Sequence, residues 1–209
     1  MSKEIDVEQG SKAWFELRLP RATASHAHQI MAGNSTIAYK SYRAKLATQK
    51  FTGKEIEGYS NDYMDDGTVN EPVARLMYSM QTGNKVRESG FWVHEQHDAG
   101  ASPDGIVNEE FGLEIKTQLP HIHLMAKLDN FIDSKYKKQM DFQMWITGFK
   151  KIDFVSYSPL IDDEFLQLAI VTYERDEARI DAIEDQTLDL LEDVNEFYDR
   201  VQELSNVSK

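Results

Sequence analysis

The sequence predicts an α/β fold in which helices flank a mixed central sheet and a long amphipathic helix ends the chain. Short apolar stretches rich in β-branched and aromatic residues recur between residues 85 and 173, as is typical of strands. Stretches with helical spacing of apolar residues precede these strands and separate them. This order of helices, strands, one long helix and further strands is typical of an α/β sandwich around a mixed sheet.

Length and composition limit the class of protein. For 209 residues we expect one domain over residues 1–209, with a core at about residues 9–177 and an acidic helical extension at about 176–205. Because there is no run of ~18 or more apolar residues and no apolar signal core at the start, we expect a cytoplasmic protein, neither secreted nor membrane-bound. The absence of cysteine excludes disulfides, thiolate metal sites and cysteine nucleophiles, and leaves carboxylates as ligands for a hard metal.

The negative charge of the chain is concentrated at one end. The formal net charge is −13, of which −11 lies in residues 161–209 and only −2 in the first 160 residues. Residues 111–151 carry a net charge of +3. Their grouped lysines are Lys135, Lys137, Lys138, Lys150 and Lys151. The overall acidity therefore does not exclude a nucleic-acid partner, because a modest basic segment is available to contact phosphates.

Helices are expected in the first third of the chain from capping residues and helix-stopping residues. The expected ranges are 11–19 before Pro20, 26–32 after a cap at Thr23 or Ser25 and before Gly33, and 38–51 before Gly53. Within this region Arg18, Arg21, Thr23 and Ser25 gather two guanidinium groups, two hydroxyls and a helix N-terminus. These groups suit an anion such as a phosphate, although ordinary caps and surface charges would give the same pattern.

A polar stretch through Asp66 is expected to be a loop, and a further helix is expected from about Thr68. The apolar stripe of that helix consists of Val69, Val73, Leu76, Met77 and Met80. Glu71 lies off the stripe in the first turn, where a carboxylate suits the helix dipole. Glu71 is therefore either a helix N-terminal charge or a third metal carboxylate beside the strands.

The second half of the chain carries most of the expected strands. Their ranges are 85–96, with an apolar centre at Phe91–Val93, then 111–117, 152–158 and 166–173. Between them, residues 120–129 are either helix or loop, and a helix at 134–148 is capped by Ser134 and ended by Gly148, with Gln139 and Gln143 one turn apart on one face. His121 and His123 suggest a metal pair at first sight, but imidazoles are poor ligands for Mg²⁺ and we assign them no metal role.

The last segment has apolar residues at alternating three- and four-residue intervals, about three and a half heptad repeats. They are Ile180, Ile183, Thr187, Leu190, Val194, Phe197, Val201 and Leu204. The spacing predicts a long helix that packs either on its own domain or on another subunit.

Residues 101–116 carry the candidate catalytic groups. Asp104 lies in a Pro- and Gly-containing turn, and an apolar strand follows it. Within that strand Glu114 and Lys116 project to the same face, and a hairpin-like return would bring Asp104 beside Glu114. A Mg²⁺-dependent phosphodiesterase needs such a group: oxygen ligands for a hard cation and an ammonium that positions or activates water. A polar turn followed by an exposed ion pair is the alternative.

Five blocks of sequence, in order and at matching approximate spacing from about Gln9 to Glu177, resemble one family. They are G-S-K-A-W-F-E-L-R-L-P-R-A-T-A-S, D-G-T-V-N-E-P-V-A-R, A-S-P-D-G, L-E-I-K and Y-K-K-Q-M-D-F-Q-M-W-I-T-G. The family is the lambda-exonuclease or YqaJ-like viral recombinase family, within the PD-(D/E)XK nuclease superfamily. The resemblance implies a PD-(D/E)XK nuclease-like fold with a mixed central sheet flanked by helices.

The resemblance also implies roles for individual residues. Asp104 and Glu114 would ligate two divalent cations, Mg²⁺ with Mn²⁺ as a substitute, while Glu71 would assist and the carbonyl of Ile115 would complete the shell. Lys116 would act on the attacking water and Gln139 would orient the water or its neighbours. The residues expected to hold a 5′-phosphate are Arg18, Ser25 and Ser102.

The expected function is a 5′→3′ double-strand DNA exonuclease of phage recombination that leaves 3′ overhangs for a single-strand annealing protein. Its expected partners are DNA ends, the annealing protein and further copies of itself in a closed ring, most simply a trimer. Two alternatives remain open: a structure-specific or restriction-type endonuclease of the same superfamily, and a non-catalytic module that binds DNA ends. Two carboxylates that face DNA phosphates argue against the module, because a binder has no need of them.

Overall fold

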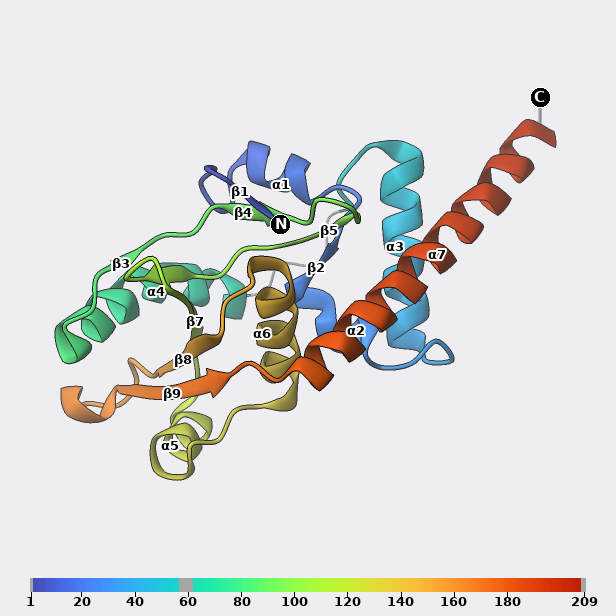
Figure 1. The fold of residues 1–209 in the computed structure, drawn as a ribbon. Coiled ribbons are helices and arrows are strands. Elements are labelled where there is room, and N and C mark those ends of the chain that lie inside the picture. The colour runs from blue at the N-terminus through green and yellow to red at the C-terminus, as the bar shows by residue number, and fades with distance from the viewer. Residues whose placement is uncertain (1, 57–61, 208–209) are drawn as a thin grey trace.

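The computed structural model describes residues 2–56 and 62–207 of the chain, and it contains two sheets (Figure 1). The five-stranded sheet has the order β3-β6-β7-β8-β9, with the pair β7 and β8 parallel and the other neighbours antiparallel. Its strands are β3 (Val86–Arg87), β6 (Gly105–Val107), β7 (Phe111–Thr117), β8 (Lys151–Tyr157) and β9 (Leu168–Glu174). The prediction of a mixed central sheet is therefore confirmed.

A second sheet of four short strands has the order β1-β4-β5-β2. Its strands are β1 (Lys3–Ile5), β4 (Phe91–Val93), β5 (Ala99–Ala101) and β2 (Ala22–Thr23). The prediction of one strand over residues 85–96 was wrong, because β3 and β4 belong to different sheets. Strands of two or three residues are too short for alternating hydrophobicity to reveal them.

The helices are α1 (Lys12–Arg18), α2 (Ala27–Ile30), α3 (Ile37–Thr52), α4 (Asp62–Thr82), α5 (Pro120–Asp129), α6 (Ser134–Thr147) and α7 (Glu177–Val207), with 3₁₀ turns η1 (Ala24–His26) and η2 (Glu164–Leu166). Helices α4, α5 and α6 pack on the five-stranded sheet, and α2 and α7 pack in turn on α6. The expected helix over residues 26–32 is thus a 3₁₀ turn followed by the short α2, without a side-chain cap at Thr23. The N-cap of α6 is Asp133 rather than Ser134, and its carboxylate accepts from the Lys135 N–H at 2.9 Å.

Side chains of β8 alternate between two hydrophobic cores. Ile152 and Phe154 lie in the core formed with α2, α3, α6 and α7, whereas Val155 and Tyr157 lie in the core formed with α4. The period of two in a strand places successive side chains on opposite faces, so one strand serves both helical layers. These layers fix α4 on one face of the sheet and α6 on the other (Figure 1).

The start and the orientation of α4 differ from the prediction. The helix begins at Asp62 rather than about Thr68, so part of the expected loop is helical, and residues 57–61 of that loop lie outside the described residues. Most of the expected inward stripe faces solvent, with exposed fractions of 73% at Val69, 62% at Leu76 and 77% at Met80. The buried face instead presents Ala74 and Tyr78, whose hydroxyl donates to the Asp153 carboxylate at 2.6 Å.

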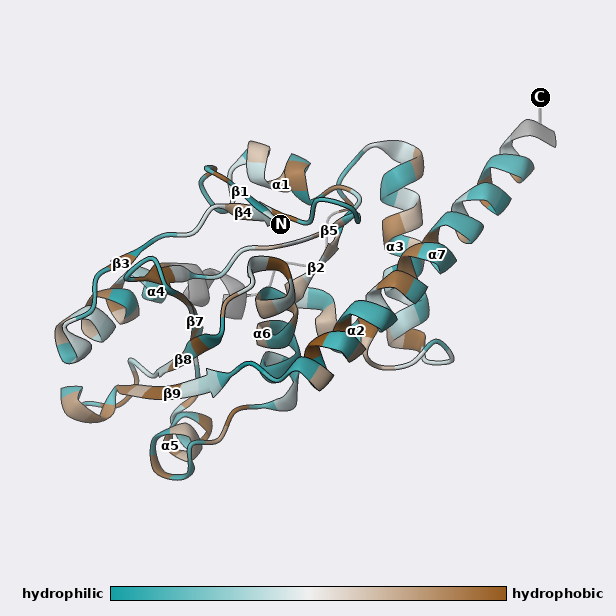
Figure 2. Ribbon diagram, in the orientation of Figure 1, coloured by the Kyte–Doolittle hydropathy of each residue, from teal (hydrophilic) through white to brown (hydrophobic). Residues whose placement is uncertain are grey.

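Helix α7 packs on α2, α3 and α6, and its contacts with α3 extend to Tyr198, whose ring centre lies 6.4 Å from that of Phe51. Ile180, Ile183, Leu190 and Val194 are buried in this part of the helix, so this part of the seam stabilises its own chain. The last turns of α7 project away from the other elements and are largely hydrophilic (Figure 2), and Leu204 is 72% exposed. Within the described part of the chain, no helix combines the length and apolar content required to span a bilayer.

Candidate active site

The β6–β7 hairpin brings two carboxylates and a lysine together. Asp104 directly precedes β6, and the pairing of Gly105 with Leu113 places it opposite the middle of β7. Its Oδ2 accepts a hydrogen bond from the Ile115 N–H at 2.7 Å, which fixes the carboxylate beside the strand. The Lys116 ammonium lies 3.7 Å from Asp104 Oδ2 and 2.5 Å from Glu114 Oε1.

Helix α6 holds the second carboxylate from the opposite side. Gln139 donates to Glu114 Oε1 and Gln143 donates to Glu114 Oε2, each at 2.6 Å. Two amides one helical turn apart therefore bind the two oxygens of one buried carboxylate. Gln139 lies where the sequence analysis placed it, beside the catalytic candidates. Gln143 received no role from the sequence, although its four-residue spacing from Gln139 was a signal for it.

The candidate site holds more negative charge than its lysine offsets. Burial raises the pKa of Glu114 to about 7, and the charge of Asp104 acts in the same direction. Burial lowers the pKa of Lys116, but the charges of Asp104 and Glu114 outweigh this and leave the pKa above its ordinary value. Lys116 is therefore an ammonium in the protein without cations. Neighbouring carboxylates with a raised pKa mark a place where added positive charge is favourable.

Glu71 approaches the same site from α4 but is turned toward Arg75. The Arg75 guanidinium donates to the Glu71 carboxylate, to the carbonyl of Asp104 at 3.1 Å and to Glu88 at 2.6 Å. Burial raises the pKa of Glu71 to about 7, with a contribution from Asp104 and against the charge of Arg75. Nothing in the sequence analysis indicated Arg75, which ties the helix to the Asp104 turn.

The donor set suits a hard divalent cation. Asp104 and Glu114 supply carboxylate oxygens close to one another, and oxygen ligands are what Mg²⁺ prefers. Across the described residues, no group of three acidic or histidine side chains forms a ready coordination shell. Glu71 Oε1 is bonded to Arg75, so Glu71 does not complete such a group with Asp104 and Glu114 in this conformation.

The predicted anion-binding residues gather at a second place. Arg18 Nη2 donates to Ser25 Oγ at 3.2 Å and to Thr23 Oγ1 at 3.4 Å. The Arg18 guanidinium lies over the Trp14 ring, 4.2 Å from its centre. Arg21 Nη1 donates to the carbonyls of Leu17 and Leu19 rather than to these hydroxyls.

Trp14 and the small sheet connect this anion-binding group to the hairpin. The Trp14 ring Nε1–H donates to Ser102 Oγ at 2.9 Å, two residues before Asp104. Ser102 is therefore linked to Arg18 through the Trp14 ring, whereas the hydroxyls that Arg18 contacts directly are those of Thr23 and Ser25. Strand β2, which carries Thr23, pairs in parallel with β5, which leads into Ser102. Trp14 was not predicted, and its position in the first helix gave no sign of this contact.

His123, one of the two histidines considered above as metal ligands, has a structural role. His123 is buried, with Nδ1 2.9 Å from Ser156 Oγ and Nε2 2.7 Å from the carbonyl of Leu166. His121 is exposed. Both ring nitrogens of His123 thus join α5 to β8 and η2, which leaves the ring no free position for a metal.

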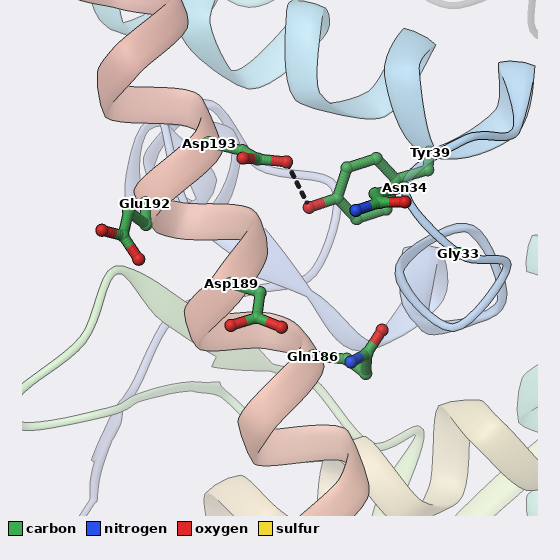
Figure 3. A pocket seen from close by; sticks show the side chains of 7 residues that line it. All are labelled: Gly33, Asn34, Tyr39, Gln186, Asp189, Glu192 and Asp193. Atoms are coloured by element: carbon green, nitrogen blue, oxygen red, sulfur yellow. Dashed lines mark hydrogen bonds between the residues drawn. The ribbon is translucent and has the colours of Figure 1, made fainter.

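A cavity of about 300 Å³ lies between α7 and the loop before α3 (Figure 3). Asp189, Glu192 and Asp193 of α7 line it, and the Tyr39 hydroxyl donates to Asp193 Oδ2 at 2.8 Å. Burial, with help from Asp193, raises the pKa of Tyr39 above its ordinary value, so the hydroxyl keeps its proton. Carboxylates repel phosphates, and this cavity is therefore unsuited to DNA.

Comparisons with known proteins agree on one family. A model of the YqaJ-like viral recombinase domain matches residues 13–150. An alkaline exonuclease (LHK-Exo) from Laribacter hongkongensis is 30% identical with a TM-score of 0.86, and LHK-Exo in complex with dAMP is 32% identical with a TM-score of 0.87; each match covers 95% of this chain and 100% of that chain.

A phage related exonuclease from Haemophilus somnus 129PT has the same fold at 17% identity, with a TM-score of 0.65 and coverage of 87% of this chain and 96% of that one. Among curated protein sequences no match was found.

Proposed function

The chain belongs to the YqaJ-like viral recombinase family, and from this membership we propose that it is a Mg²⁺-dependent 5′→3′ exonuclease of double-stranded DNA. The observation that carries the proposal is the convergence of Asp104, Glu114 and Lys116 at one end of the β6–β7 hairpin. The enzyme would shorten one strand from its 5′ end and leave a 3′ overhang for a phage single-strand annealing protein. We infer that residues 1–209 act as one nuclease domain in the cytoplasm of a bacterial host.

Asp104 and Glu114 would hold two Mg²⁺ ions, with Glu71 and the carbonyl of Ile115 as further ligands. Such ions, when bound, supply positive charge at the scissile phosphate and make water more acidic. Gln139 and Gln143 hold the Glu114 carboxylate, because they occupy both of its oxygens. This arrangement limits rotation of the carboxylate and fixes the direction in which its remaining lone pairs point.

Lys116 would position the attacking water and donate a hydrogen bond to the developing negative charge. Its ammonium lies 3.7 Å from Asp104 Oδ2 and 2.5 Å from Glu114 Oε1, beside the carboxylates that would hold the cations, and so beside a phosphate that those cations would bind. Because the pKa of Lys116 is raised, the side chain keeps its proton and acts as a donor rather than as a base in the cation-free protein.

The direction of digestion would come from the group around Arg18. A 5′-phosphate there would accept hydrogen bonds from Arg18 and Ser25, while Ser102 orients Trp14 beneath the guanidinium. The first phosphodiester bond would then have to reach the carboxylates, and the pairing of β2 with β5 supports this, because β5 leads into the turn that carries Asp104.

Digestion of defined DNA substrates tests the proposed function. We expect Mg²⁺-dependent digestion of linear duplex from 5′-phosphorylated ends, no digestion of closed circles, and complete loss of activity with a chelator. Duplexes labelled at the 5′ or the 3′ end distinguish the direction by the size of the labelled products. Cutting of closed circular DNA would instead establish an endonuclease, and binding of ends without any product would establish a non-catalytic module.

We propose a ring-shaped homo-oligomer, a trimer in the simplest case. A chain with a net charge of −13 repels DNA at long range, so enclosure of the duplex rather than strong attraction would hold the substrate. Two exposed apolar surfaces support contacts between copies. One surface lies on α4 and consists of Val69, Val73, Leu76 and Met80. The other lies on α5 and η2 and consists of Leu124, Leu128, Phe165 and Leu166. The acidic outer half of α7 would remain available to the annealing protein.

Light scattering coupled to size exclusion tests the oligomer. We expect a mass near three times 24.1 kDa for the natural protein and a smaller mass for Leu76→Glu, because a charge in a buried apolar contact is unfavourable. Gln81→Glu on an exposed part of the same helix is the matched control and should leave the mass unchanged. A monomer that digests long DNA without dissociating would contradict the ring.

A further inference from the structure

His26 lines a small cavity beside Arg18 and has no part in the proposed mechanism. The cavity has a volume of about 50 Å³, enough for a small anion or a few waters. Its charged and ionisable lining comprises Arg18, Arg21, His26, Lys45 and Glu55. The balance of charge therefore favours an anion there.

Aromatic stacking fixes the orientation of the imidazole. The ring of His26 stacks on the ring of Tyr42 with centres 4.3 Å apart and planes 4° apart. Tyr42 is buried in α3, and its hydroxyl oxygen accepts a hydrogen bond from the Thr23 N–H at 3.0 Å. One buried residue thus positions both the imidazole and the strand that carries Thr23.

The imidazole contacts both hydroxyls that Arg18 contacts. His26 Nδ1 lies 3.0 Å from Thr23 Oγ1 and 3.2 Å from Ser25 Oγ. Because Arg18 Nη2 donates to both hydroxyl oxygens, their hydrogens must point away from the guanidinium. The hydroxyls lie 3.4 Å from each other, and Nδ1 can accept the hydrogen of one of them when the neutral ring carries its own hydrogen on Nε2.

The surroundings keep this ring neutral. Burial lowers the pKa of His26 to about 3, and the charges of Lys45 on α3, Arg18 on α1 and His28 on α2 act in the same direction. A terminal phosphate acquires its second charge at a pKa of about 6. In the protein without DNA the ring is therefore neutral throughout the pH range in which a free terminal phosphate is a dianion.

We propose that His26 is a positioning residue for the terminal phosphate of the DNA. Its Nδ1 accepts the hydroxyl hydrogen of Thr23, and this leaves the hydroxyl of Ser25 and the guanidinium of Arg18 free to donate to the phosphate. The inference rests on the proposed function, because the anion is identified as the 5′-phosphate of the substrate.

Two substitutions distinguish the role of the Nδ1 acceptor from the role of the stacked ring. His26→Phe keeps an aromatic ring on Tyr42 and removes the acceptor, whereas His26→Asn places Oδ1 where Nδ1 was and removes the ring. Binding is measured by fluorescence anisotropy with duplexes that carry either a 5′-phosphate or a 5′-hydroxyl, with a chelator present to prevent cleavage. We expect His26→Phe to reduce the preference for phosphate by up to roughly 10-fold, which corresponds to the loss of about one neutral hydrogen bond, and His26→Asn to retain the preference within about twofold.

Arg18→Ala is the control that should remove the preference altogether. Equal preference in the natural protein and His26→Phe, or equal loss in the Phe and Asn variants, would overturn the role of His26 while the proposed function stood. Absence of any preference for phosphate in an active natural protein would instead contradict the assignment of the Arg18 site.

A second measurement observes the His26 ring in the natural protein directly. Nitrogen chemical shifts of ¹⁵N-labelled histidine report which ring nitrogen carries the hydrogen. We expect the His26 signal, identified by its loss in His26→Phe or His26→Asn, to show an unprotonated Nδ1 from pH 6 to pH 9. A hydrogen on Nδ1, or a ring that titrates within that range, would refute the proposal.

Discussion

Lys116→Ala should reduce strand cleavage by roughly 10³-fold or more while leaving the protein folded and able to bind DNA. The ammonium lies 2.5 Å from Glu114 and 3.7 Å from Asp104, so it is the donor available where the phosphate would react. Cation binding should persist or become tighter, because the ammonium and a divalent cation compete for the same carboxylate oxygens.

Single-turnover digestion of an end-labelled duplex measures the rate of the cleavage step, and calorimetric titration with Mn²⁺ measures the affinity for the cation. Lys12→Ala is the matched control, since it also removes one lysine but from an exposed i,i+4 pair with Glu16. Near-normal single-turnover cleavage by Lys116→Ala would remove Lys116 from the mechanism.

Glu114→Gln should abolish cation binding and cleavage while making the cation-free protein more stable. The folded-state pKa of Glu114 is about 7 against an ordinary value of 4.5, so ionisation of this carboxylate costs stability as the pH rises through that interval. The amide cannot ionise, and the gain above pH 7 should be on the order of 1–3 kcal/mol.

Thermal melts with a chelator, repeated from pH 5 to pH 8, measure this gain. The difference in melting temperature between Glu114→Gln and the natural protein should be small at pH 5 and should grow toward pH 8. Glu110→Gln, at an exposed position of the same hairpin, should show no such trend. A variant that melts lower than the natural protein at pH 8 would show that Glu114 stabilises the fold as an anion.

The sequence was informative where one physical pattern determined the local structure. Alternation around Glu114 predicted β7, and the Asp104 turn predicted the hairpin that pairs Gly105 with Leu113. Heptad-like spacing predicted α7, because a continuous apolar stripe must be covered.

Other features depend on contacts that spacing cannot reveal. The apolar residues of α4 suggested an inward stripe, but a hydrogen bond from Tyr78 to buried Asp153 helps hold a different face inward. Gln143 reaches Glu114 only because α6 crosses β7 at this point. His26 meets Thr23 and Ser25 locally, yet its stacking on Tyr42 requires α3 to return beside η1.

The parallel pairing of β2 with β5 also bears on the size of the products. Thr23 pairs with Gly100, which is four residues before Asp104, so the strand beside Arg18 is hydrogen-bonded to the strand that leads into the Asp104 turn. If Arg18 holds the 5′-phosphate and Asp104 holds the cations, this pairing would keep the two sites at a fixed separation. Each cut would then remove a fragment of the same length, whatever the base sequence between the two sites.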